Sequence, residues 1–431
     1  MLGLNYKLAK LEEEGKKVKV GLVGAGQMGK GMVSQMLLMK GMVPSLVVDI
    51  FLDRAVESFK LAGVGREQIV VAKTLKDANF AIEQGKYVVA EDFEFATKAD
   101  LIDVVVDATG VPNMGALIAT QAILNKKHIV MLNVEADVVV GPMLNKLAKN
   151  SGVVYTGTAG DEPGAVKELY DFADAAGFEV LVVGKGKNNP LNIEATPDTV
   201  SEEASKVGFN PMMLASFKDG TKTMVEMTCM ANATGFLPDI RGGHGPTASV
   251  NELKEIFKLK NEGGILNKYK IVDYVNGIAP GVFIIITSSL PQVHHEMKFL
   301  SMGSGPNYVL YRPYHLASLE TPLTVARAAI DGEPTIVPME GKPVAETITI
   351  AKKNLKLGEN LDGIGGFTVY GSIETYEVAK ENNYVPIGLI NKNAVMKADV
   401  RKGEPITYDM VQLDKSTLIY KLRKLQEDII G

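Results

Sequence analysis

Apolar stretches alternate with amphipathic stretches through the first 185 residues of the chain. Residues 18–23 are almost wholly apolar, as expected of a strand buried on both faces of a parallel sheet. The apolar positions from Met28 to Leu37 then recur at helical spacing, and this segment stops at Gly41. The same alternation repeats several times. It predicts a doubly wound α/β domain of the Rossmann type.

The elements expected in this domain follow one another with short connections. Pro142 is expected in the first turn of the last helix, and Gly152 lies just beyond its end. Strands are expected at residues 18–23, 45–48, 87–90, 102–106, 128–132 and 153–156, and helices at 54–61, 74–84, 114–125 and 142–150.

Three glycines connect the first strand to the first helix. Gly24 permits a tight turn, Gly26 lets the backbone approach a phosphate, and Gly29 lets the helix pack closely on the strand. The free N–H groups and the positive end of the helix attract an anion. We therefore predict that a dinucleotide binds at these glycines and at Gln27 and Met28 of the same turn.

An acidic residue follows the second strand at the distance that the dinucleotide motif requires. The carboxylate of Asp49 could accept both ribose hydroxyls of NAD, and it would repel the 2′-phosphate of NADP. The alternative is that Asp49 only ends a strand and that Arg54 holds a 2′-phosphate. The cofactor is therefore predicted to be NAD or NADP, with NAD favoured.

A second group of small residues ends the strand at 102–106. Thr109 and Gly110 follow Asp107 there, and small residues at this sheet edge would leave room for the nicotinamide half of the cofactor. Both are predicted to contact the cofactor.

Composition and charge narrow the class of protein. The 431 residues are 46% hydrophobic and 23% charged, which is typical of a globular protein with several domains. The net charge of −5 gives no electrostatic footprint for nucleic acid or an anionic membrane. The single Cys229 excludes an internal disulfide and a multi-cysteine metal site. No signal-peptide pattern and no apolar run of membrane-spanning length is seen, so a cytoplasmic location is expected.

Two further regions follow the nucleotide-binding domain. In the middle region, a helix is expected at 161–176, a helix from Pro322 to Gly332 with Thr321 as its cap, and strands at 179–183, 223–227 and 281–287. In the tail, residues 351–361 recur as 396–406, which suggests two similar strand-turn units in a β-rich module. The predicted domains are 1–160, 161–337 and 338–431.

Two lysines in the middle region are the strongest candidates for proton transfer. Lys185 and Lys187 lie two apart at a strand end, so both ammonium groups project to the same side. Each would lower the pKa of the other, which suits a group that moves the hydroxyl proton during hydride transfer. Asn188 and Asn189 follow as candidate substrate-binding residues. The alternative is a solvated basic turn.

A glycine-rich loop at 238–246 is the candidate for binding a substrate anion. It places Asp239, Arg241 and His244 among glycines, a composition suited to a phosphate or carboxylate. Its alternative is a mobile surface loop. Arg312 and His315 form a second, weaker candidate for the same role.

Two carboxylates open the middle region. Asp161 and Glu162 could bind a divalent cation through oxygen, although carboxylates at a helix start more often interact with the helix end. They are the candidate metal ligands.

The whole chain resembles the homoserine-dehydrogenase-like proteins with a C-terminal SAF domain, the group that includes a 1-deoxy-D-xylulose 5-phosphate reductoisomerase-like enzyme. The resemblance is carried by specific strings in this sequence: DATG (107–110), NVEADV (133–138), AGDEP (159–163), GKGKNNPLN (184–192), KTMVEM (222–227), ANATG (231–235), PDI (238–240), HGP (244–246), RPYHL (312–316) and PLTVAR (322–327).

This resemblance implies a nicotinamide domain, an α+β catalytic and dimerisation domain, and a small β-rich SAF module of β-clip type. It strengthens the lysine pair and the loop as active-site parts, with Asp239 as a third catalytic candidate. It also adds Asn133 and Glu135 to the predicted cofactor contacts. The implied assembly is a homodimer or a higher homo-oligomer.

The implied activity is reduction or isomerisation of a small ketose phosphate, as in the isoprenoid-pathway enzyme that makes 2-C-methyl-D-erythritol 4-phosphate. The reductoisomerase-like enzymes use NADPH, whereas this chain has Asp49 at the ribose position. Val134 and Glu135 follow Asn133, where homoserine dehydrogenases have a lysine, so homoserine is not the expected substrate. The alternatives are a catabolic NAD-dependent dehydrogenase of a sugar acid or sugar phosphate, and a dinucleotide-responsive carbohydrate-binding protein.

Overall fold

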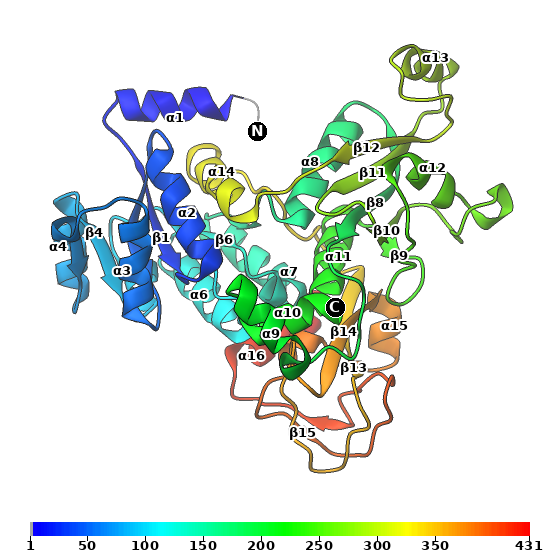
Figure 1. Ribbon diagram of the computed structural model, residues 1–431. Helices are drawn as coiled ribbons and strands as arrows, with labels where there is room; N and C mark the ends of the chain where they lie inside the picture. Colours follow the sequence, from blue (N-terminus) through cyan, green and yellow to red (C-terminus); the bar gives the residue numbers. More distant parts are fainter. Residues whose placement is uncertain (1–2) are drawn as a thin grey trace. The chain divides into compact units, whose positions relative to one another are not determined.

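The computed structural model of the protein describes residues 3–431 (Figure 1). Its internal contacts divide the chain into two compact units. Unit 1 contains the chain as far as Gly164, residues Leu316–Val337 and residues Lys421–Gly431. Unit 2 contains residues Ala165–His315 and Pro338–Tyr420. This division into two units rests on internal contacts and does not test the three predicted domains, which remain a prediction.

Unit 1 is built on a parallel sheet with the strand order β3-β4-β2-β1-β5-β6-β7. The order reverses at β1, so its carboxyl end and that of β5 flank the crevice in which doubly wound sheets bind their ligands. The predicted Rossmann architecture is confirmed. The strands are β1 (Val18–Val23), β2 (Met42–Val48), β3 (Ile69–Val71), β4 (Tyr87–Ala90), β5 (Val104–Asp107), β6 (His128–Met131) and β7 (Tyr155–Gly157).

Helices cover this sheet, and α14 packs beside α2 within the unit (Figure 1). The helices are α1 (Leu4–Glu13), α2 (Gln27–Leu38), α3 (Leu52–Leu61), α4 (Leu75–Glu83), α5 (Glu94–Lys98), α6 (Pro112–Leu124), α7 (Val134–Ser151) and α14 (Ala317–Asp331). Two further helices, α8 (Glu162–Ala175) and α16 (Leu418–Ile429), each have residues in both units.

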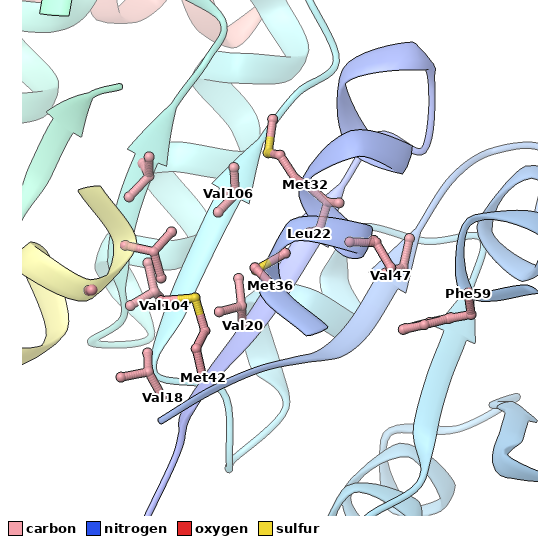
Figure 2. Close-up of a cluster of buried hydrophobic side chains, with 14 of the residues drawn as sticks. Val18, Val20, Leu22, Met32, Met36, Met42, Val47, Phe59, Val104 and Val106 are labelled. Atoms are coloured by element: carbon pink, nitrogen blue, oxygen red, sulfur yellow. The ribbon is translucent and has the colours of Figure 1, made fainter. Parts of the chain in front are cut away.

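The core of unit 1 lies where β1, β2 and β5 meet α2. Val20, Leu22, Val104 and Val106 are fully buried, and Figure 2 shows them beside the methionines of α2. Each such side chain contributes about 1.5–3 kcal/mol through its removal from water. This packing holds the glycine loop, which connects β1 to α2, on a rigid base.

Helix α7 begins eight residues before the predicted start at Pro142 and contains that proline in its interior. The side chain of Asn133 caps the helix by accepting a hydrogen bond from the Ala136 N–H at 3.2 Å. Acidic residues in the first turn add to the stability of this end. The prediction was wrong because it took the proline as the start and overlooked the asparagine cap.

Helix α14 also begins earlier than predicted, at Ala317, and Pro322 lies inside it. The hydroxyl of Thr321 donates to the carbonyl of Ala317 at 2.7 Å and does not cap the helix. Gly332 ends the helix in the left-handed conformation, as predicted, with φ of 66°.

Unit 2 contains a mixed sheet with the strand order β12-β11-β8-β10-β9. Strands β8, β10 and β9 run parallel, whereas β11 is antiparallel to both β8 and β12. Its elements are β8 (Glu179–Lys187), α9 (Pro197–Val207), α10 (Pro211–Lys218), α11 (Thr221–Thr234), β9 (Leu237–Pro238), α12 (Leu253–Ile256), β10 (Ile271–Asn276), β11 (Val282–Thr287), α13 (Pro291–Phe299) and β12 (Tyr308–Arg312).

The predicted strand at 223–227 is wrong, because these residues lie in helix α11. Gly220 and Gly235 bound this helix with positive φ angles of 89° and 76°. Almost every residue between them is buried, so the helix has no polar face to reveal its period in the sequence. The apolar residues of the segment had favoured a strand.

Strand β8 is longer than the predicted strand at 179–183. It continues to Lys187 and pairs with both β10 and β11. The two lysines therefore lie within a buried strand of the sheet.

The tail of unit 2 contains the internal repeat, and its two copies contact each other. Leu355 and Val400 occupy equivalent positions of residues 351–361 and 396–406. They exchange backbone hydrogen bonds, with Leu355 N–H donating at 2.8 Å and Val400 N–H donating at 3.0 Å. The named elements here are β13 (Ala345–Ala351), β14 (Val369–Thr375), α15 (Tyr376–Glu381), β15 (Val395–Met396) and β16 (Val411–Gln412).

A second pair of backbone hydrogen bonds between the two copies of the repeat also joins equivalent positions. The N–H of Gly358 donates to the carbonyl of Met396 at 2.8 Å, and the equivalent N–H of Gly403 donates to the carbonyl of Ala351 at 2.9 Å. The two copies are thus related by a local two-fold arrangement. The identity of this module as an SAF domain remains a prediction.

Candidate functional site

The glycine loop at the carboxyl end of β1 has the close backbone contacts expected of a phosphate-binding turn. Gly24 has φ of +104°, and a Cβ there would lie 2.8 Å from the carbonyl oxygen of Ala108. A Cβ at Gly29 would lie 2.0 Å from the carbonyl oxygen of Gly24. A Cβ at Gly26 would meet no atom within 4 Å, which leaves open space above the backbone at the start of α2.

Asp49 is fixed next to this loop. One carboxylate oxygen accepts a hydrogen bond from the Ala25 N–H at 2.8 Å, and the other accepts one from the Phe51 N–H at 2.9 Å. Each oxygen can accept a further bond from a ribose hydroxyl. The guanidinium of Arg54, the alternative cofactor contact, stacks over the ring of Phe51 at 4.4 Å.

A buried network at the ends of β5 and β6 forms the other side of the predicted cofactor site. One oxygen of Asp107 accepts hydrogen bonds from the N–H of Thr109 at 2.9 Å and from its hydroxyl at 2.7 Å. The other oxygen accepts one from the amide nitrogen of Asn133 at 2.9 Å. Burial raises the pKa of Asp107 to about 6, although these three bonds act in the opposite direction.

This network brings together Thr109 and Asn133, two predicted cofactor contacts. The organising residue, Asp107, was not predicted as functional, although it begins the DATG string. Gly110 has φ of 64°, Glu135 is half-buried in the first turn of α7, and Gln27 and Met28 are exposed at the start of α2.

In unit 2, Lys185 and Glu226 form a buried ion pair. The ammonium of Lys185, on β8, contacts one carboxylate oxygen of Glu226, on α11, and both side chains are at most 5% exposed. The ammonium of Lys222 lies 3.9 Å from the other carboxylate oxygen. Glu226 therefore lies between two cationic side chains.

Glu226 was not predicted as a site residue because its segment was interpreted as a strand. Its signal in the sequence was a lone carboxylate in an apolar stretch, four residues after Lys222, which is a helical ion-pair spacing.

Lys187 lies two residues along the same strand and is also buried. Its ammonium donates a hydrogen bond to the carbonyl oxygen of Phe217 at 2.8 Å. Burial, followed by the positive charge of Lys185, lowers the pKa of Lys187 to about 8. A lysine with this pKa can both donate and accept a proton near neutral pH.

The loop after β9 holds His244 against Asp239. The Nε2 atom of His244 lies 2.8 Å from a carboxylate oxygen of Asp239, whose side chain is fully buried. The backbone N–H and the side-chain amide of Asn267 donate to the same oxygen at 3.0 Å and 3.1 Å. The structure thus brings together two of the three polar residues predicted in this loop.

Asp273, on β10, fixes the loop through its backbone. Its carboxylate accepts hydrogen bonds from the N–H groups of His244, Gly245 and Tyr274 at distances between 2.7 and 3.1 Å. Burial raises the pKa of Asp273, and the three N–H groups act to lower it. The carboxylate of Asp273 thus anchors the backbone of the loop to β10.

Arg241 is directed to the tail of unit 2. Its Nε donates to a carboxylate oxygen of Glu374 at 2.8 Å, and a terminal nitrogen lies 3.3 Å from the hydroxyl of Tyr384. These bonds use two of the five N–H donors of the guanidinium and hold it toward the tail. Binding of a substrate anion by Arg241 stays a prediction.

The second candidate for anion binding also has partners. The guanidinium of Arg312 pairs with Glu168 at 3.0 Å and stacks over the ring of Tyr314 at 4.6 Å. His315 is half-buried three residues later.

Four predicted site residues remain: two asparagines that follow β8 and two carboxylates at the start of α8. Asn188 is exposed and Asn189 is half-buried, directly after β8. Asp161 and Glu162 are both buried at the start of α8. Their role as ligands of a divalent cation stays a prediction.

Two family models match this chain in separate segments. Residues 24–156 match the NAD-binding domain of homoserine dehydrogenase. Residues 160–321 match the catalytic domain of oxidoreductase DRL. The first segment contains the glycine loop, Asp49 and the Asp107 network, and the second contains the lysines and the His244 loop.

Solved structures with similar chains are also found. A probable dehydrogenase from Thermotoga maritima is 13% identical, with a TM-score of 0.43, over 74% of this chain and 91% of the other. Scyllo-inositol dehydrogenase from Lactobacillus casei, with bound NAD(H) and scyllo-inositol, is 15% identical, with a TM-score of 0.38, over 69% of this chain and 76% of the other. No curated protein matches the chain.

No helix within residues 3–431 has both the length and the apolar character needed to cross a membrane. The cytoplasmic location, the homo-oligomeric assembly and the absence of nucleic-acid and membrane partners stay predictions.

Proposed function

We propose that this NAD(P)-dependent oxidoreductase acts on a small ketose phosphate and that Lys187 carries the proton that accompanies hydride transfer. The observation that carries the proposal is the buried ammonium of Lys187, whose pKa is lowered to about 8. The resemblance of the GKGKNNPLN string to the reductoisomerase-like enzymes adds the substrate class. Isomerisation of the ketose before its reduction belongs to the same proposal.

The chemical need for such a group follows from charge balance. When hydride adds to a carbonyl carbon, the oxygen becomes an alkoxide unless a proton reaches it. In the reverse direction, a base must take the hydroxyl proton as hydride leaves. Lys187 supplies the proton as an ammonium and takes it back as an amine.

Lys185 and Glu226 have a supporting role in this proposal. The charge of Lys185 lowers the pKa of Lys187, as the sequence had predicted for the pair. Glu226 fixes the ammonium of Lys185 in the buried region through their ion pair, although its own negative charge acts to raise the pKa of Lys187. Without this anchor, the charge that acts on Lys187 would not be held in one place.

The nicotinamide cofactor supplies the hydride, and unit 1 contains the residues that would bind it. The backbone of Gly24, Gly26 and Gly29 would receive the pyrophosphate, and Asp49 would accept the ribose hydroxyls. Thr109 and Asn133 would line the nicotinamide half. The two carboxylate oxygens of Asp49 support NAD over NADP, because a 2′-phosphate would meet a second anion.

The experiment measures the absorbance of NADH or NADPH with a panel of ketose phosphates. The wild type should oxidise one of the two reduced cofactors, and Lys187→Met should lower kcat on the order of 100-fold while the Kd for NADH changes little. Lys206→Met is the control, because Lys206 lies on an exposed ion pair of α9. Full activity of Lys187→Met would remove this lysine from the mechanism.

A second candidate is a catabolic NAD-dependent dehydrogenase of a sugar acid or sugar phosphate. The observation that favours it is Asp49, since the reductoisomerase-like enzymes use NADPH. Running the panel in the oxidative direction, with NAD and sugar acids, distinguishes the two. Turnover of an acid sugar without any ketose activity would favour this candidate.

A further inference from the structure

We infer that His244 and Asp239 form a second proton-transfer pair, in which His244 exchanges a proton with a substrate hydroxyl and Asp239 is its positioning residue. This inference rests on the proposed function and deepens it. It assigns to His244 a role in rearranging the substrate, a step in which Lys187 is the second proton carrier, in addition to the role of Lys187 in hydride transfer.

The hydrogen bond between the two residues sets the tautomer of the imidazole. A carboxylate only accepts hydrogen bonds, so the Nε2 atom of His244 donates to Asp239 across their 2.8 Å separation. In the neutral ring, Nδ1 is then the atom with a free lone pair. Within residues 3–431, no hydrogen bond to Nδ1 is found, and 15% of the side chain is exposed.

Asp239 can stabilise the imidazolium that forms when Nδ1 takes a proton. Its side chain is fully buried, and His244 is its ion-pair partner within the described part of the chain. The oxygen that does not contact His244 is buried and has no hydrogen-bond partner among those residues. The negative charge is therefore only partly satisfied by donors and acts strongly on a positive ring nearby.

The surrounding loop holds the pair in a fixed position. Both carboxylate oxygens of Asp273 lie 3.0–3.1 Å from the backbone nitrogen of His244. Gly243 and Gly245 have positive φ angles of 72° and 54°, and a Cβ at Gly245 would lie 2.3 Å from the ring of Tyr274. A side chain at either position would displace the loop.

The same contacts connect the pair to the lysines within unit 2. Tyr274 pairs in register with Lys185 across β10 and β8. Gly243 lies beside the side chain of Met227, the neighbour of Glu226 on α11. The loop is thus built on the strand and the helix that also form the lysine site.

An isomerisation needs two proton transfers, and one group cannot perform both at once. His244 Nδ1 takes the proton of a hydroxyl next to the carbonyl, and the O–H electron pair forms the new carbonyl. A substituent moves with its bonding pair to the neighbouring carbon, and the old carbonyl oxygen takes a proton from Lys187. One proton leaves the substrate and one arrives, so the rearrangement consumes no further reactant. His244 then releases its proton to water, and Lys187 takes one up from water before it protonates the alkoxide formed by hydride transfer.

The test compares two reactions of the full-length protein. With a ketose phosphate from the panel, His244→Gln should lower kcat by about 100-fold, the size typical of a lost acid–base group. Direct reduction of a hydroxyaldehyde phosphate, which needs no rearrangement, should change by less than about threefold. Lys187→Met should lower both rates. His295→Gln is the control, because His295 is exposed on α13.

Two further readouts distinguish catalysis from a structural role. Imidazole added to His244→Ala should restore part of the ketose turnover. The pH profile of kcat/KM for the ketose should lose one limb in His244→Gln. Asp239 and Asp273 are the two carboxylates that contact His244, so they are the charged groups that could shift the position of that limb. Asp239→Asn should lower turnover while the NADH affinity is kept.

An equal loss of both reactions, or no loss of either, overturns the inference. Failed rescue together with an unchanged pH profile does the same and leaves His244 as a structural residue of the loop. Retained activity in Lys187→Met would contradict the proposed function instead, so the two failures are distinguishable.

Discussion

Replacing Lys187 with methionine should change how stability depends on pH as well as activity. Folding buries the ammonium and lowers the pKa of Lys187 from 10.5 to about 8. Below pH 8 the charged form is held in the folded protein at a cost of about 3 kcal/mol, at 1.36 kcal/mol per pKa unit. Between pH 8 and 10.5 the unfolded chain binds more protons, so this contribution to stability rises with pH.

Methionine keeps most of the side-chain volume and has no proton to lose. It also leaves the Phe217 carbonyl without its bond from Lys187, which costs about 1 kcal/mol at every pH. Between pH 7 and pH 10 the wild type should gain about 2 kcal/mol of stability from the titration of Lys187, and Lys187→Met should not. The difference in the free energy of unfolding, variant minus wild type, should therefore fall by the same amount. Urea unfolding of both proteins at several pH values measures this difference.

Taking the difference between the two proteins removes the titration of all other groups that both contain. Lys206→Met provides the control, since Lys206 is solvated in the folded protein and should show no such trend. A difference between Lys187→Met and the wild type that stays constant within about 0.5 kcal/mol from pH 7 to pH 10 would refute the burial argument. Folding would then not destabilise the charged form of Lys187, and its pKa would not be lowered. The reason for choosing Lys187 as the proton carrier would no longer hold.

Four other predictions follow from the same site. Oxidation by the wild type should rise with pH through about 8 and reduction should fall, because Lys187 acts as an amine in one direction and as an ammonium in the other; parallel pH profiles would contradict this. Asp49→Ser should weaken NAD binding and improve NADP binding by about 1–3 kcal/mol in a titration, and tighter NADP binding by the wild type would contradict the assignment. Glu226→Leu should lower the free energy of unfolding by about 3 kcal/mol in urea, since it removes a buried ion-pair partner of Lys185, and an unchanged midpoint would argue against a buried pair. Arg241→Lys should leave KM within about twofold and cost less than about 1 kcal/mol of stability, because the pair with Glu374 is partly exposed, whereas a tenfold rise in KM would restore Arg241 as the residue that binds the substrate anion.

The nucleotide-binding half of the fold could be predicted from the sequence because its signals are local. Fully apolar strands, amphipathic helices and three glycines in a fixed spacing lie next to one another along the chain. The ends of the helices were less predictable. At α7 and α14 a proline was interpreted as a helix start, whereas the side chain of Asn133 begins α7 and the proline lies inside each helix.

The lysine site was only half predictable. Lys185 and Lys187 lie two residues apart, so their common direction follows from strand geometry alone. Glu226 lies 41 residues further along the chain, and its contact with Lys185 depends on how α11 packs on the sheet. Because α11 is buried on nearly all sides, it shows no helical period, and the local signal of this carboxylate was limited to its four-residue spacing from Lys222.

The loop at 238–246 shows the same limit. Its polar residues were identified, but their partners were not, since Arg241 binds Glu374 across more than a hundred residues of sequence. A guanidinium among glycines can bind a phosphate or a carboxylate side chain equally well. In this chain a carboxylate side chain, that of Glu374, is its partner.

The two-fold arrangement of the tail bears on how such a module could have arisen. Each copy supplies the backbone donors and acceptors that the other copy uses, as in the reciprocal bonds between Leu355 and Val400. A peptide with a single copy would leave these groups open and could satisfy them only by joining an identical peptide. Fusing two such peptides into one chain would convert a concentration-dependent association into an intramolecular one. After fusion, the two halves are free to diverge in sequence, so long as the hydrogen bonds between them are kept.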